Sequence, residues 1–325
     1  MTSTSTTPPA APAAAHRGSR WLSPVLLANL VAEVGIVVTG GLVRVTGSGL
    51  GCPTWPECTD GSITPTVTQP QGFHKYIEFG NRTLTSVLVI LALATVVTVW
   101  VAAPRRAMKV ASIVVLGGVV AQALLGGVTV LLGLNPAIVA AHFLLSMGLV
   151  AASSYLWFAR HEGAGPPQSL VPPLVSRLGW VTAAFGAAVL ALGTVVTGSG
   201  PHSGDANEPN RFGFDPRTVS WLHADLVMIF IGLVVATWLA ARLTAVDDER
   251  GPARAWLVVL AVGLGQGLIG YVQYFTNLPE ALVIAHMLGA SLLVVSLTHG
   301  ILALRRRGGS ATTQVDSARS VLEQA

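Results

Sequence analysis

The sequence predicts an all-α integral membrane protein with eight transmembrane helices. Of its 325 residues, 52% are hydrophobic and only 10% are charged, and the mean hydropathy is +0.64. A soluble domain carries about 25% charged residues. Since roughly 20 apolar residues cross the hydrocarbon core of a bilayer, the apolar runs place the helices at 22–43, 83–102, 110–133, 138–158, 178–197, 219–241, 255–275 and 281–303.

The basic residues predict the orientation of these helices. Of 19 Lys and Arg residues, five fall on one side of the arrangement, namely Arg44, Lys75, Arg82, Arg211 and Arg217, and the others fall on the opposite side. Lys and Arg accumulate in cytoplasmic loops. We therefore expect a multi-pass protein of the cell membrane, with both termini cytoplasmic and its functional loops outside. The basic residues form no single stripe, which argues against a nucleic-acid partner.

The sequence also repeats itself. The motif VTGSG occurs at 45–49 and again at 196–200, each time at the end of a predicted helix. A longer stretch that begins at Gln122 matches one that begins at Gln266 without a gap. Such self-similarity indicates a duplicated unit. Because four spans return the chain to its starting side, the two units would run in the same sense, as in parallel repeats.

The repeat predicts two pseudo-symmetric four-helix bundles, at 21–160 and 177–307. A cytoplasmic linker at 161–176 would join them. We expect a disordered cytoplasmic tail at 1–20, because this segment is rich in Ser, Thr, Pro and Ala and has no apolar face. A second polar tail would follow at 308–325.

Three histidines lie inside predicted helices. His142 and His286 each stand twenty residues after the glutamine that opens the repeat, and His223 lies in the second helix of the second half. A histidine in a bilayer indicates a functional site, although it can also hydrogen-bond a neighbouring helix. Two imidazoles at equal depth on diagonal helices can hold a haem iron from both faces. His223 and His286 are therefore predicted axial haem ligands, and His142 marks the same place in the first half.

A polar cluster lies at the outer end of the second helix. Glu78, Asn81 and Arg82 share one helix face through their i,i+3 and i,i+4 spacing. They could form an interfacial ion pair at a helix start. Alternatively, Glu78 could move protons at a bound porphyrin, while Arg82 or Arg44 pairs with its propionates.

Together these residues resemble the haem A synthase family over about residues 22–303. The resemblance rests on the loop GGLVRVTGSGLGCPTWPEC, the cluster EFGNR, His142, and the pair His223 and His286. It implies an oxidoreductase that converts a ring methyl of haem O to a formyl group, which gives haem A for cytochrome oxidase. The second half would hold haem b as a redox relay through His223 and His286.

In the first half, the resemblance implies that haem O binds with His142 as an axial ligand and that Glu78 is the catalytic acidic residue. The family often has a histidine where this chain has Asn81. Asparagine is a poor iron ligand, so the substrate haem would be five-coordinate or held through water against Asn81.

The resemblance further implies a disulfide between Cys52 and Cys58. Their outer loop would face an oxidising compartment, where a disulfide persists, and two thiols are too few for a zinc site. The disulfide could staple the loop or exchange with a thiol partner.

Two other functions remain open at this stage. A membrane b-type cytochrome would transfer electrons from quinol without modifying haem, and a transporter would also fit a duplicated bundle. The partners expected for a haem A synthase are haem O, a haem O synthase that delivers it, and an electron acceptor that the sequence does not identify.

Overall fold

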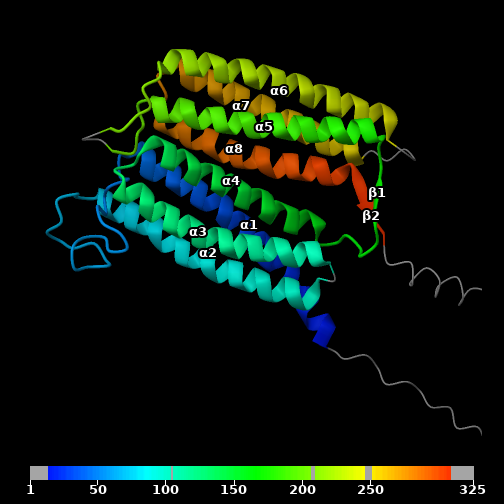
Figure 1. Ribbon diagram of the computed structural model, residues 1–325, viewed down its shortest axis with the longest axis horizontal. Coiled ribbons are helices and arrows are strands. Elements are labelled where there is room, and N and C mark those ends of the chain that lie inside the picture. Colours follow the sequence, from blue (N-terminus) through cyan, green and yellow to red (C-terminus); the bar gives the residue numbers. More distant parts are fainter. Residues whose placement is uncertain (1–13, 104, 206–208, 246–250, 309–325) are drawn as a thin grey trace, which may run out of the picture.

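The computed structural model describes residues 14–103, 105–205, 209–245 and 251–308, and within them it contains eight long helices (Figure 1). All eight are long and apolar enough to cross a membrane, α1 from Arg20 onward. The predicted all-α membrane fold is therefore confirmed. The helices are α1 (Ala14–Val45), α2 (His74–Ala102), α3 (Arg106–Leu131), α4 (Pro136–Ala159), α5 (Pro173–Ser199), α6 (Pro216–Thr244), α7 (Gly251–Phe275) and α8 (Glu280–Ala303).

All eight helices begin earlier than predicted, and the difference is largest for α1 and α2. α2 starts at His74 rather than near residue 83, because its first turns are polar and an apolar window does not register them. α1 starts at Ala14, so the prediction of a disordered tail is wrong for residues 14–20. The tail predictions for residues 1–13 and 309–325 lie outside the described residues.

Buried apolar side chains form three clusters. One is built from α1 to α4 and a second from α5 to α8. The third joins the two groups through Leu30 and Val37 of α1, Met147 and Val150 of α4, and Val294 of α8. Figure 1 shows the first four helices lying beside the last four. These contacts agree with a division into two related bundles, which stays a prediction.

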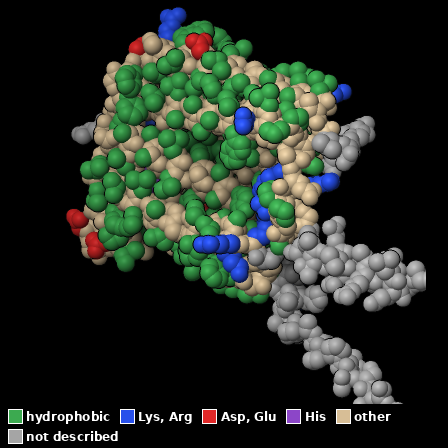
Figure 2. Space-filling model, turned by 45° about the vertical axis from the view of Figure 1, so that its right-hand side comes forward, with side chains coloured by type: hydrophobic (Ala, Val, Ile, Leu, Met, Phe, Trp, Pro, Cys, Tyr) green, Lys and Arg blue, Asp and Glu red, His purple; other side chains and the backbone are tan. Residues whose placement is uncertain are grey.

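The first helix begins and the last helix ends at the same end of the molecule, and the long loop at 46–73 lies at the opposite end (Figure 1). Hydrophobic side chains cover most of the face in Figure 2, while Lys and Arg side chains gather toward one end. This arrangement suits a bilayer around the middle of the helices. The cytoplasmic side of the termini stays a prediction.

The segment at 161–176 is not a plain linker. Within it, β1 (Pro167–Ser169) pairs antiparallel with β2 (Arg305–Arg307), which follows α8. Glu162 forms an ion pair with Arg105 at 2.6 Å and lies 3.8 Å from a guanidinium nitrogen of Arg305. Strands of three polar residues leave no apolar alternation in a sequence, which explains why they were not predicted.

Candidate functional site

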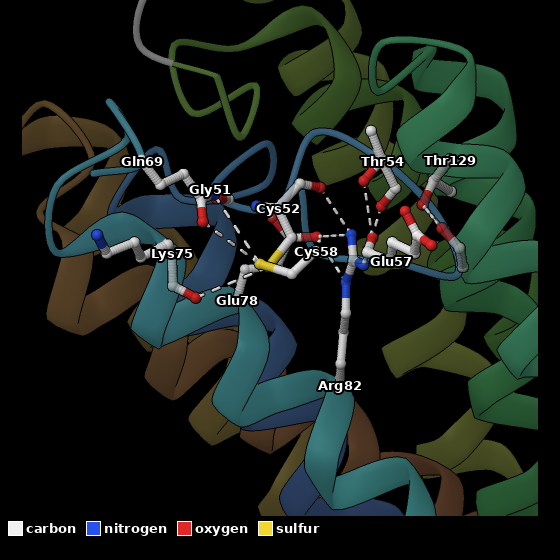
Figure 3. A network of polar contacts seen from close by, with 11 residues as sticks. Gly51, Cys52, Thr54, Glu57, Cys58, Gln69, Lys75, Glu78, Arg82 and Thr129 are labelled. Atoms are coloured by element: carbon white, nitrogen blue, oxygen red, sulfur yellow. Dashed lines mark hydrogen bonds and ion pairs between the residues drawn. A yellow bond between two sulfur atoms is a disulfide. The ribbon is translucent and has the colours of Figure 1, made fainter. Parts of the chain in front are cut away.

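The loop between α1 and α2 contains the Cys52–Cys58 disulfide. The backbone N–H of Cys52 donates to Glu78 Oε2 of α2 at 2.6 Å (Figure 3). The Glu78 side chain is buried, with 5% of the residue exposed. The structure therefore joins two features that the sequence analysis treated separately, the cysteine loop and the acidic residue of α2.

Arg82 anchors the same loop. Its Nε and Nη2 donate to Glu78 Oε1 at 3.0 and 2.6 Å. Its Nη1 donates to the backbone oxygens of Thr54 and Glu57 at 3.0 and 3.1 Å, and Nη2 also donates to Cys52 O at 2.7 Å (Figure 3). A guanidinium has five N–H groups. Each of the five has a protein acceptor, so in this structure Arg82 holds the loop and has no donor left for a propionate.

Two other basic side chains at this end of the molecule also donate hydrogen bonds to backbone carbonyl groups. Lys75 Nζ donates to Thr66 O at 2.6 Å. Arg44 donates through Nε to His202 O at 2.6 Å and through Nη2 to Thr197 O at 2.9 Å. Arg44 thus ties the end of α1 to the end of α5 and its following loop, a contact between the two groups of helices.

The cysteine loop also reaches α3 and its surroundings. A Cβ atom added to Gly127 would collide with the indole of Trp55, so that glycine lets the loop pack closely on the helix. The neighbouring Gly126 faces His142, since a Cβ there would lie 3.3 Å from His142 Cε1. The loop therefore covers the part of α3 next to His142.

His142 and His286 have matching surroundings. Each is the seventh residue of its helix, α4 or α8. The side chain of Gln122 donates to His142 O at 2.9 Å, and that of Gln266 donates to His286 O at the same distance. A Cβ on Gly270 of α7 would lie 3.6 Å from His286 Cε1, so Gly270 faces His286 in the way that Gly126 faces His142. The repeat in the sequence is thus reproduced in the contacts of the two histidines.

Another pair of equivalent positions lies on the second helix of each half. His223 and Asn81 are each the eighth residue of their helices, α6 and α2. A Cβ on Gly193 of α5 would lie 3.2 Å from His223 Cε1. Asn81 instead accepts a hydrogen bond from Thr39 of α1 at 2.7 Å.

The histidines suit a haem iron better than a bare metal ion. Among the described residues, no group of three or more His, Cys, Asp or Glu side chains could hold an ion. A porphyrin supplies four ligands itself and needs only one or two from the protein. The Nδ1 atoms of His142 and His286 are buried without a hydrogen-bond partner, so neither ring is held by a hydrogen bond to a neighbouring helix through that atom.

The glycines that face the histidines, and also Thr39, were not predicted as parts of the site. For Gly126 and Gly270 a signal existed, since each stands four residues after the glutamine that opens its repeat. No comparable pattern marks Gly193 or Thr39, because their partners lie on neighbouring helices at distances that only the folded chain defines.

Comparison with known proteins agrees with this architecture. Residues 23–204, more than half of the chain, match the family described as cytochrome oxidase assembly protein. This chain belongs to that family. The match confirms the resemblance drawn from the loop, the EFGNR cluster and the histidines.

Proteins named Heme A synthase are similar to this chain over different lengths. The one from Lysinibacillus sphaericus is 26% identical over 305 residues, and the similar region covers 89% of this chain and 96% of that protein. A Heme A synthase from Bacillus pumilus is 34% identical over 142 residues, 43% of this chain and 45% of that protein. One from Listeria welshimeri is 34% identical over 121 residues, 37% of this chain and 39% of that protein.

Proposed function

We propose that the protein is a haem A synthase, a membrane oxidoreductase that converts a ring methyl of haem O to the formyl group of haem A. The observation that carries the proposal is the pair of matching histidine environments, with a glutamine and a glycine placed alike around His142 and His286. Similarity to a Heme A synthase over 96% of that relative's length supports it.

In the second half, His223 and His286 would hold haem b as its axial ligands. The buried Nδ1 atom of His286 and the close glycines Gly193 and Gly270 support this assignment. The glycines leave room beside each ring, so the helices can approach while the imidazoles turn toward a porphyrin. Haem b, when bound, supplies one-electron redox chemistry.

In the first half, His142 would bind the iron of the substrate haem O. Asn81 occupies the position that His223 has in the second half, but its side-chain oxygen accepts a hydrogen bond from Thr39. An asparagine engaged in this way gives the iron no second strong ligand. The substrate haem would therefore be five-coordinate, which distinguishes it from the haem b of the second half.

Glu78 is the residue proposed to accept or donate protons near the substrate. Its carboxylate is oriented by Arg82 and by the N–H of Cys52, and the loop that Arg82 holds would exclude water from the site. Arg82 would act on the substrate through the loop it fastens rather than through propionates. Arg44 uses only Nε and one Nη2 donor in its bonds to two backbone oxygens, so it stays a proposed propionate contact. The loops at this end would face outward from the cell membrane, where a haem O synthase could deliver its product.

The test is to express the chain in a haem O-producing host that lacks its own haem A synthase. The protein should purify with b-type haem, and extracted haems should include haem A. A protein that carries haem but yields only haem O would instead be the b-type membrane cytochrome. A protein without haem absorption would overturn both the proposal and that alternative.

A further inference from the structure

α1 carries an acidic side chain at the middle of its membrane-spanning part. Glu33 lies midway between Arg20 and Val45, the ends of that part, so it stands roughly 20 Å from each at 1.5 Å per residue. Only 2% of the residue is exposed, and its Oε1 has no hydrogen-bond partner. Ionisable groups at such depth are costly and mark function by default. The proposed haem sites make no use of this one.

A second unsatisfied acceptor stands one turn from Glu33. Asn29 lies four residues earlier on the same helix face and is 1% exposed. Its Nδ2 donates to Ser153 Oγ of α4 at 2.9 Å, whereas its Oδ1 has no partner. Two neighbouring buried acceptors therefore both lack a donor, and each such group destabilises the folded protein.

Nothing on the packed helices neutralises a charge on Glu33. α1 packs against α2, α4 and α8, and among the described residues no hydrogen bond or ion pair joins Glu33 to a charged group of these helices. Burying a carboxylate without a partner favours its uncharged acid form. The titratable and charged side chains of the three helices are His74, Lys75, Tyr76, Glu78 and Arg82 on α2, His142 and Tyr155 on α4, and Glu280, His286 and His299 on α8.

We propose that Glu33 is a proton-binding site within the membrane. In the acid form, its hydroxyl donates to Asn29 Oδ1, which completes a hydrogen-bonded chain from Glu33 through Asn29 to Ser153. A single proton on Oε1 thus satisfies both acceptors. The proton binds to the carboxylate and leaves to water as the O–H bond breaks, so the exchange requires no electron acceptor.

α1 also contributes to the first-half site, because Thr39 of this helix donates to Asn81 Oδ1 at 2.7 Å. Thr39 stands six residues after Glu33, about 9 Å along the helix axis at 1.5 Å per residue. Glu33 would exchange protons between the first-half site and the end of the molecule that holds the termini. This role rests on the proposed function.

Infrared spectroscopy of the purified full-length protein tests the proton directly. The wild type should show a carbonyl band of a protonated carboxylic acid that shifts on transfer to D2O. Glu33→Gln should lose this band, and Ser154→Ala should keep it, because Ser154 neighbours Ser153 but donates only to Val150 O of its own helix. Absence of the band from the wild type, its persistence in Glu33→Gln, or its failure to shift in D2O would each overturn the proposal.

Asn29→Leu provides a second variant that keeps the acid and removes its acceptor. The band should move in this variant but not vanish, which keeps the proposal testable if Glu33→Gln does not fold. An unmoved band would contradict the chain from Glu33 to Asn29.

The use of the proton is tested by haem O conversion. Glu33→Gln should retain its haem content and convert haem O roughly a hundredfold more slowly or worse, at the lower end of general acid–base effects. Unchanged conversion would overturn the role in the reaction. Since the infrared band does not depend on haem A formation, a wild type with an exchangeable acid but no haem A would overturn only the proposed function.

Discussion

The backbone N–H of Cys52 donates to Glu78 Oε2 at 2.6 Å, so the disulfide loop and the buried carboxyl of α2 form one unit. Arg82 completes this unit by contacting both the Glu78 carboxyl and the backbone oxygen of Cys52. A substitution in the loop should therefore disturb the Glu78 carboxyl of α2, and a substitution at Glu78 or Arg82 should disturb the loop.

Glu78→Gln should reduce haem A formation by roughly a hundredfold or more, because a general acid or base contributes about 10²–10⁴-fold. The amide cannot take up a proton at neutral pH, and its NH2 group faces donors on both sides. Haem A would be measured by extraction and chromatography, relative to the haem content of the protein. Thr83→Ala is the matched control, since Thr83 is exposed and donates only to Phe79 O. Wild-type haem A levels in Glu78→Gln would contradict the assignment.

Arg82→Lys should loosen the cysteine loop although the positive charge is kept. Lysine has three donors and no planar fork, so it cannot replace the five contacts of the guanidinium. We expect the Cys52–Cys58 disulfide to be reduced several-fold faster under limiting reductant, as measured by alkylation of the released thiols. Arg211→Lys is the control, because Arg211 makes an exposed hydrogen bond to Pro201 O. Equal reduction rates in the two variants would show that Arg82 does not restrain the loop.

Gly193→Ala and Gly270→Ala should affect the haem of the second half differently. The new Cβ would lie 3.2 Å from His223 Cε1 in the first variant but 3.6 Å from His286 Cε1 in the second. The first distance is shorter than an ordinary carbon contact of about 3.5–4.0 Å, and the second falls within it. Gly193→Ala should therefore lower haem occupancy or alter the absorption spectrum, while Gly270→Ala should leave both unchanged. The reverse order of effects would refute this view of the haem pocket.

His142→Ala should remove binding of the substrate haem and leave haem b in place. Haem b would be held by His223 and His286, which lie on α6 and α8 rather than on the substituted helix α4. Titration of the purified variant with haem O, followed by absorption, measures the loss. His161→Ala serves as the control, because His161 is exposed beyond the end of α4. If haem O bound to His142→Ala with an unchanged spectrum, another residue would be the ligand.

Much of this architecture could be predicted from local patterns. Hydropathy located all eight helices, because a membrane span needs about 20 apolar residues in succession. The repeat identified His142 and His286 as equivalent, and the structure surrounds them with the same contacts. The beginning of α2 was missed, since its polar first turns are stabilised by the loop before it rather than by their own hydropathy.

Sequence alone thus determined the helices, the candidate histidines and the cysteine loop, because each depends on residues close together in the chain or on a repeated pattern. Tertiary structure decided which groups contact one another. In the folded chain, Arg82 donates to carbonyl groups 25 to 30 residues away, and Gly193 lies against His223. Tertiary structure also left Glu33 and Asn29 as buried acceptors without donors. These outcomes depend on which groups meet across helices, and no local periodicity encodes that.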